Sequence, residues 1–115
     1  ENSPDILVVL GDRFETFCCA TSARICGIPI AHIHGGETTQ GAIDEAFRHG
    51  ITKMAHLHFP VCEAYRRRII LMGEQPRHVY NVGALGVENI RNLKFMEKEY
   101  LEKLIEFKLD KPFSL

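Results

Sequence analysis

Apolar residues occur along the chain in two patterns, short continuous runs and longer stretches with helical spacing, and the two patterns alternate. The runs are rich in Ile, Leu and Val, which is typical of strands that are buried on both faces of a parallel sheet. They predict strands at residues 6–10, 28–33, 57–61 and 79–82, and an apolar run at 112–115 predicts the start of another strand. The helical stretches predict helices at residues 13–26, 42–55, 63–72, 87–93 and 96–107.

This alternation predicts an α/β fold with a Rossmann-like, doubly wound parallel sheet, because a right-handed helical crossover returns each strand parallel to the one before it. Ligands of such sheets bind beyond the carboxyl ends of the strands. The loops that follow the four predicted strands therefore form the candidate site: Asp12–Arg13, 34–37, 60–61 and 83–86.

The ends and faces of the first two helices can also be predicted. Asp12 is placed to act as the N-cap of the first helix, with Glu15 as the partner in a capping box and Gly27 at the C-cap. In the second helix, four apolar residues at helical spacing are expected to face the core: Ile43, Phe47, Ile51 and Met54.

Charge, the length of apolar runs and the cysteine content indicate which partners and which compartment the protein has. The 115 residues carry 14 Lys and Arg against 15 Asp and Glu, a net charge of −1, which argues against nucleic acid or an anionic membrane as a partner. The longest aliphatic run, residues 6–10, is far shorter than the roughly 20 residues of a membrane-spanning helix. Four cysteines lack both metal-ligand spacing and the density of a disulfide scaffold, which favours the cytoplasm: Cys18, Cys19, Cys26 and Cys62.

Two loops carry groups that could act on a ligand. Asp12 could face a ligand while Arg13 holds a phosphate, although a role of Asp12 as helix cap alone is the simpler interpretation of these two residues. In the second loop, Gly35 and Gly36 would let the backbone approach a ligand beside His34 and Glu37. The alternative for this loop is an ordinary glycine turn with a solvated carboxylate.

The second helix adds a charged pair. Asp44 and Arg48 are four residues apart and so share a helix face near the glycine loop, where they could work together or form a simple surface ion pair. Glu45 and His49 repeat this spacing one residue later.

Other polar clusters favour structural roles. Two H-x-H pairs, His32 with His34 and His56 with His58, suggest a metal site, but the pairs lie on different predicted strands and need not converge. For His56 and His58, a role as hydrogen-bonded structural residues is the simpler interpretation. The triplet 66–68 of arginines is expected on a solvated helix face. Neither a Walker motif nor G-x-G-x-x-G is present, so nucleoside triphosphatases and nicotinamide dehydrogenases have no support.

Taken together, a set of motifs in this order resembles the UDP-N-acetylglucosamine 2-epimerase family, in its hydrolysing branch of sialic acid biosynthesis. The motifs are GDRFE at 11–15, HIHGGE at 32–37, GAIDE at 41–45 with Arg48 and His49, ITK at 51–53 and HLH at 56–58. The resemblance implies a glycosyltransferase B type enzyme of two domains. Residues 1–107 would be part of its N-terminal domain with the crossover helices, and 108–115 would begin a truncated second domain, whose remainder is a missing partner.

The resemblance also implies an activity: UDP-N-acetylglucosamine and water would give N-acetylmannosamine and UDP, through elimination to a 2-acetamidoglucal and hydration, without metal or nicotinamide. It further implies a homo-oligomer, and the isolated chain is expected to lack turnover. Three alternatives stay open. These are a non-hydrolysing 2-epimerase, a metal-dependent phosphohydrolase that uses Asp12 and the histidines, and a non-catalytic nucleotide-sugar-binding module.

Residue roles follow from the same resemblance. Asp12 and Asp44 resemble the acid and base carboxylates of the family, Arg48 its charge-stabilising arginine, and Arg13 a contact to UDP. Many relatives have Glu at the position of His34. We therefore hypothesise that His34 or the nearby Glu37 serves as the base at that position.

Overall fold

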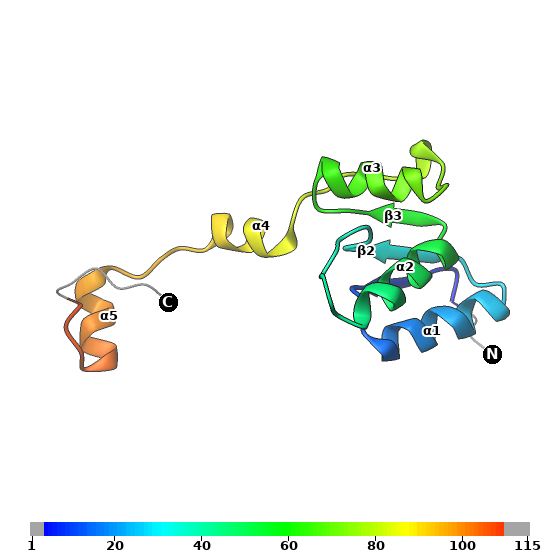
Figure 1. Cartoon of the computed structure of the whole chain (residues 1–115). Helices are drawn as coiled ribbons and strands as arrows, with labels where there is room; N and C mark the ends of the chain where they lie inside the picture. Colours follow the sequence, from blue (N-terminus) through cyan, green and yellow to red (C-terminus); the bar gives the residue numbers. More distant parts are fainter. Residues whose placement is uncertain (1–3, 110–115) are drawn as a thin grey trace.

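The structure, a computed structural model, describes residues 4–109 and has an α/β fold (Figure 1). Three parallel strands form one sheet in the order β1-β2-β3. The strands are β1 (Leu7–Leu10), β2 (Ile30–Ile33) and β3 (Leu57–Phe59). The helices are α1 (Phe14–Ile25), α2 (Asp44–Met54), α3 (Glu63–Leu71), α4 (Leu85–Asn92) and α5 (Lys98–Ile105), with a 3-10 turn at Pro76–His78.

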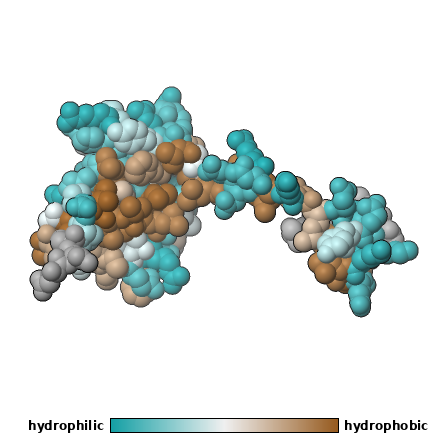
Figure 2. Space-filling model, turned by 180° about the vertical axis from the view of Figure 1, so that it is seen from behind, coloured by the Kyte–Doolittle hydropathy of each residue, from teal (hydrophilic) through white to brown (hydrophobic). Residues whose placement is uncertain are grey.

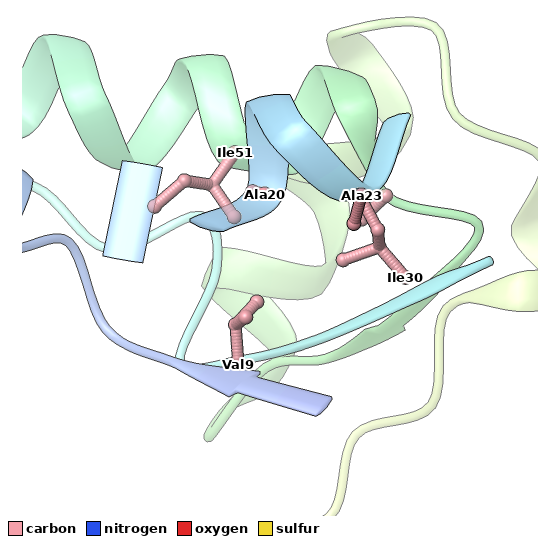
Figure 3. Packing of buried hydrophobic residues seen from close by; sticks show 6 residues of the cluster. Val9, Ala20, Ala23, Ile30 and Ile51 are labelled. Atoms are coloured by element: carbon pink, nitrogen blue, oxygen red, sulfur yellow. The ribbon is translucent and has the colours of Figure 1, made fainter. Parts of the chain in front are cut away.

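The core lies between the sheet and the helices α1 and α2 (Figure 3). The rings of Phe17 and Phe47 pack with centroids 5.4 Å apart, which joins the two helices. Gly50 allows this close approach, because a Cβ there would lie 2.7 Å from the Phe17 ring. The fully buried cluster is made of small and branched residues: Val9, Ala20, Ala23, Ile30, Ile51 and Ala55.

The register of the sheet brings two histidines together. Val9 is paired with His32, and His32 is paired with His58, so these three side chains lie on one face of the sheet. This is the face that α1 and α2 cover, since Val9 belongs to the core cluster. The pairing of β2 with β3 thus places one histidine of each H-x-H motif side by side in the interior.

The ends of two helices differ from the prediction. Asp12 is not the N-cap of α1: Arg13 is, and no side chain caps the helix, so the predicted capping box is wrong. Asp12 is instead bound to another element. Ile43 is 75 % exposed, because α2 begins only at Asp44 and Ile43 precedes its first turn. The burial of Ile51 and the partial burial of Phe47 confirm the remainder of the predicted apolar face.

The predicted fourth strand is also wrong in extent. Only Val79 forms a parallel bridge, to His58, although the amides of Tyr80 and Val82 still donate hydrogen bonds to residues of β3 and its following loop. The segment therefore runs beside β3 for a few residues. It ends at Gly83, where a φ of 80° turns the chain away.

The sheet has one face without a helical cover in the described residues. Figure 2 shows hydrophobic residues gathered on one face of the part that holds the sheet. Val8 and Leu10 of β1, which alternate with the buried Val9, are more than half exposed. The helices α4 and α5 lie away from the sheet (Figure 1). No helix among residues 4–109 is long and apolar enough to cross a membrane.

The predicted strand at 112–115 and most of the predicted start of a second domain at 108–115 lie outside the described residues. The assignment of residues 1–107 to a partial N-terminal domain stays a prediction.

Candidate active site

The candidate site lies where β1 and β2 end. Asp12 follows β1 by two residues, and the segment from His34 to Glu37 follows β2 directly. Because parallel strands end at the same edge of the sheet, these two loops are neighbours. The third contribution comes from α2, which carries Asp44 and Arg48.

An ion pair joins the first loop to α2. The Arg48 Nη2 donates a hydrogen bond to Asp12 Oδ2, and Nη1 lies 3.4 Å from the Thr39 hydroxyl. The Arg48 side chain is 8 % exposed and that of Asp12 22 % exposed. Within the described residues, Nε of Arg48 has no hydrogen-bond acceptor. The arginine is thus fixed at the rim of the site, where its charge is little screened by solvent.

Asp44 does not form the ion pair with Arg48 that the spacing of the two residues suggested. It is the first residue of α2 and is half-buried, and the described ion pairs include none between Asp44 and Arg48, since Arg48 is engaged by Asp12. The second predicted pair is confirmed, with Glu45 Oε1 3.4 Å from His49 Nε2.

A histidine and a glutamate meet in the second loop. His34 Nδ1 lies 3.1 Å from Glu37 Oε1, and both side chains are about three-quarters buried, with 28 % and 24 % exposed. His34 has a φ of 64°, in the left-handed region that disfavours a residue with a side chain. Such strain costs about 1–2 kcal/mol and is often found at functional sites. The pair can hold and transfer a proton.

Arg13 lies beside Asp12 but points elsewhere. Its side chain is 77 % exposed and forms an ion pair with Glu15 at 3.2 Å. The pKa of Glu15 is lowered, first by a hydrogen bond from the backbone and also by Arg13. An exposed arginine at the N-cap of a helix can form charge-assisted hydrogen bonds with an anion.

His32 of β2 is a further polar residue near the two loops. The sequence pattern had indicated it only as one half of an H-x-H pair. It is fully buried. Its Nε2 lies 2.8 Å from the Gly11 carbonyl and its Nδ1 lies 3.1 Å from the Thr52 hydroxyl. Burial is the main reason that the pKa of His32 falls to about 4. The sequence signal that could have identified His32 as a buried, hydrogen-bonded residue was the position of a polar residue within an apolar strand.

The other histidines have structural partners. His56 Nδ1 accepts a hydrogen bond from the Ile30 amide at 3.2 Å, and its Nε2 lies 2.8 Å from Arg24 Nη1, which confirms the structural interpretation. His58 is buried, with Nε2 3.4 Å from Glu74, and its pKa is lowered mainly by desolvation. Among residues 4–109, no three His, Cys, Asp or Glu side chains are arranged to hold a metal ion.

The prediction of a solvated arginine triplet is wrong for two of its members. Arg66 donates to the Val79 carbonyl at 3.1 Å, and Arg68 donates to the Gly36 carbonyl and lies over the Tyr65 ring. Only Arg67 is largely exposed, at 76 %. The reason is that α3 passes close to the glycine loop, where a Cβ on Gly36 would lie 2.6 Å from the Tyr65 carbonyl.

Comparison with known proteins assigns the family. The family model described as UDP-N-acetylglucosamine 2-epimerase matches residues 1–115, the whole chain. The chain belongs to the UDP-N-acetylglucosamine 2-epimerase family. The motifs that carried the resemblance therefore lie in a true member of that family, and the family's α/β fold is the one observed.

Two curated proteins are similar to most of the chain. The chain is 46 % identical over 112 residues to GDP/UDP-N,N'-diacetylbacillosamine 2-epimerase (hydrolyzing) of Campylobacter jejuni, covering 97 % of this chain and 29 % of the relative. It is 48 % identical over 101 residues to polysialic acid biosynthesis protein P7 of Escherichia coli, covering 88 % and 26 %. The chain thus spans less than a third of these relatives.

A solved structure has the same fold. The UDP-GlcNAc 2-epimerase of Neisseria meningitidis, bound to UDP-GlcNAc, superposes with a TM-score of 0.73 at 23 % identity, covering 93 % of this chain and 31 % of that protein.

Proposed function

We propose that this chain supplies part of the active site of a hydrolysing nucleotide-sugar 2-epimerase, which converts UDP-N-acetylglucosamine and water into N-acetylmannosamine and UDP. The observation that carries the proposal is the pairing of Arg48 with Asp12 at the same sheet edge as the pairing of His34 with Glu37. The 46 % identical relative is named as a hydrolyzing 2-epimerase of another nucleotide sugar, which supports the hydrolysing outcome.

The first half-reaction needs a base and a cation. In the proposal, the His34–Glu37 pair accepts the proton from C2 of the sugar, the C–H electrons form the C1–C2 double bond, and the C1–O bond to UDP breaks. The departing diphosphate carries the electron pair. Arg48 and the exposed side chain of Arg13 stabilise that negative charge, which is the largest electrostatic demand of the step.

The second half-reaction adds water across the glycal. A proton is delivered to C2 from the opposite face and a hydroxyl is added at C1, so that one water is consumed and the configuration at C2 is inverted. We assign delivery of the proton to Asp44, which is outside the Asp12–Arg48 ion pair, and orientation of the water to the ionised carboxylate of Asp12. Arg48 holds Asp12 in place for this step, since their ion pair is largely excluded from solvent.

A second candidate substrate has a specific basis. The relative from Campylobacter jejuni is named for N,N'-diacetylbacillosamine linked to UDP or GDP. The proposed chemistry at C1 and C2 would be the same, and the additional acetamido group would have to be accommodated elsewhere in the enzyme.

A chimera tests the proposal. The 112 matched residues of the Campylobacter jejuni enzyme are replaced by those of this chain, and the chimera is incubated with UDP-N-acetylglucosamine and with UDP-N,N'-diacetylbacillosamine. We expect release of UDP and of the free 2-epimerised sugar from at least one of them. The isolated chain is the control, and we expect no turnover from it because it spans only 29 % of that enzyme.

The same assay separates the alternatives. A non-hydrolysing enzyme would give an epimerised sugar that is still linked to UDP. A binding module would give no product. A metal-dependent phosphohydrolase would lose activity with EDTA and contain stoichiometric metal, whereas we expect activity that resists EDTA.

We also propose the cytoplasm as the site of action and a homo-oligomer as the assembly. The first is supported by exposed free thiols at Cys18, Cys19 and Cys26, which suit a reducing compartment. The second rests on the family resemblance alone, and light scattering on the chimera would measure it.

A further inference from the structure

The side chain of His32 has a defined protonation pattern. The carbonyl of Gly11, 2.8 Å from Nε2, can only accept a hydrogen bond, so Nε2 carries the proton. The pKa of the ring is lowered to about 4, first by burial and then by the nearby charges of His58 and Arg48, while the hydrogen bond to Gly11 and the charge of Asp12 oppose this shift. The ring is therefore neutral near pH 7, and its Nδ1 is an acceptor.

Thr52 extends this contact to α2. Its hydroxyl lies 3.1 Å from His32 Nδ1 and 3.0 Å from the Arg48 carbonyl, and Thr52 is fully buried. The hydroxyl has one proton, so it donates to one of these two acceptors at a time. In either arrangement it lies between the imidazole and the helical turn from which the Arg48 side chain reaches Asp12.

The glycine loop rests on the same contact. A Cβ at Gly35 would lie 2.9 Å from His32 Nδ1 and 3.1 Å from Thr52 Oγ1. The backbone of Gly35 is thus packed directly against the two side chains. Gly35 lies in the sequence between His34 and Glu37, whose side chains contact each other.

We propose that His32 and Thr52 are positioning residues that fix the three segments of the site relative to one another. His32 holds the carbonyl just before Asp12, Thr52 holds the turn that carries Arg48, and together they form the surface on which the His34–Glu37 loop lies. Neither touches substrate. The inference rests on the proposed function, because positioning has a meaning only if these segments act on one ligand.

The test uses the chimeric full-length enzyme and three variants. Thr52→Val removes the hydroxyl at nearly constant volume, and Thr52→Ser restores it. Thr21→Val is the matched control, because the Thr21 hydroxyl also bonds the carbonyl four residues earlier, at 2.8 Å, but lies in α1 away from the site. We expect Thr52→Val to lower kcat about 10–100-fold, as expected for misplaced catalytic groups, with KM within about 3-fold. Thr52→Ser should keep most of the activity and Thr21→Val nearly all of it.

A measurement on the unaltered enzyme covers the case in which Thr52→Val does not fold. Nitrogen-15 spectra of the histidine rings, assigned with His32→Gln, should show His32 protonated only at Nε2 and unchanged between pH 8 and 5.5. A ring protonated at Nδ1, or one that titrates near pH 6.5, would overturn the inference.

The activity results are equally decisive. Full kcat in Thr52→Val, or an equal loss of kcat in Thr21→Val, would refute positioning while leaving the proposed function intact. An unaltered chimera that releases no UDP from any substrate contradicts the proposed function itself, and the inference is lost with it.

Discussion

Arg48, in α2, donates a hydrogen bond to Asp12, which follows β1 and lies 36 residues earlier in the sequence. The pair joins the end of one strand to a helix that belongs to the next crossover. It also explains why Asp12 does not cap α1, since its carboxylate is turned toward the arginine. A residue that would otherwise stabilise a helix end is thus available to the site.

Breaking the ion pair between Asp12 and Arg48 should lower the free energy of unfolding. Asp12→Asn would leave a guanidinium that is 8 % exposed without its anionic partner. We expect the free energy of unfolding to fall by about 3 kcal/mol, the lower end of the range for a broken buried pair because Asp12 keeps some contact with solvent. Urea denaturation of the chimera measures it. Lys98→Gln, which breaks an ion pair whose lysine is 55 % exposed, is the control and should change little.

The strained residue of the glycine loop should separate activity from stability. His34→Gly removes the imidazole and also the cost of its φ of 64°. We expect the free energy of unfolding to stay within about 1 kcal/mol of the original, because the relief of strain offsets the greater freedom of the unfolded chain. Turnover should fall at least about 100-fold if the imidazole takes part in proton transfer.

The companion variant is Glu37→Gln, which removes the carboxylate but keeps the shape of the side chain. Normal turnover in both His34→Ala and Glu37→Gln would show that this pair is not the base.

Much of the fold could be predicted because strands and helices follow from local hydrophobic spacing. The run around Val9 and the spacing of Phe47 and Ile51 are local signals, and the elements formed there. The first and last residues of a helix or strand are harder to predict, because a few residues with only a weak preference for that structure decide them. Ile43 therefore lies before α2, and only Val79 of the predicted strand 79–82 forms a bridge.

The site was predicted as a set of loops but not as a set of contacts. The loops at Asp12 and at 34–37 do follow β1 and β2, as predicted, and their part in a site stays a prediction. The partner of Arg48 was not predictable, because Asp44 at four residues' distance has the right spacing and Asp12 becomes a neighbour only when the sheet forms. The role of His32 likewise depends on the register of β2 and on Thr52 across the core.

Gly35 should not tolerate a side chain. Gly35→Ala would place a Cβ within 3.1 Å of both His32 and Thr52, which are fully buried. We expect a loss of about 1–3 kcal/mol in the free energy of unfolding, as for other overpacked sites. Gly86→Ala in α4, where a Cβ would meet nothing within 4 Å, is the control and should be neutral or slightly stabilising. Equal midpoints for the two variants in urea would show that the loop does not rest on these side chains.

Stability should decrease in mild acid. Burial lowers the pKa of His32 from 6.5 to about 4, so between these values the unfolded chain binds a proton that the folded chain does not. The contribution of the neutral His32 to the free energy of unfolding is therefore complete above pH 6.5 and is lost as the pH falls toward 4. The loss between pH 7 and 5 is about 2 kcal/mol.

The pKa of His58 on β3 is also lowered, mainly by desolvation. Glu74 opposes this shift, and His78 and Lys53 add to it. His58 therefore also reduces the free energy of unfolding as the pH falls. Urea midpoints of the unaltered chimera and of His32→Gln, measured from pH 8 to 5, should converge at low pH. Parallel curves would show that His32 is not held neutral by burial.

The most direct test of the proposed chemistry is the fate of the hydrogen at C2 of the sugar. The chimera is incubated with UDP-N-acetylglucosamine in D2O, and the released sugar is examined by proton NMR. Removal of the C2 proton by the site and its return from solvent on the opposite face predict N-acetylmannosamine with deuterium at C2, together with free UDP. Release of N-acetylglucosamine that still carries protium at C2 would contradict the account.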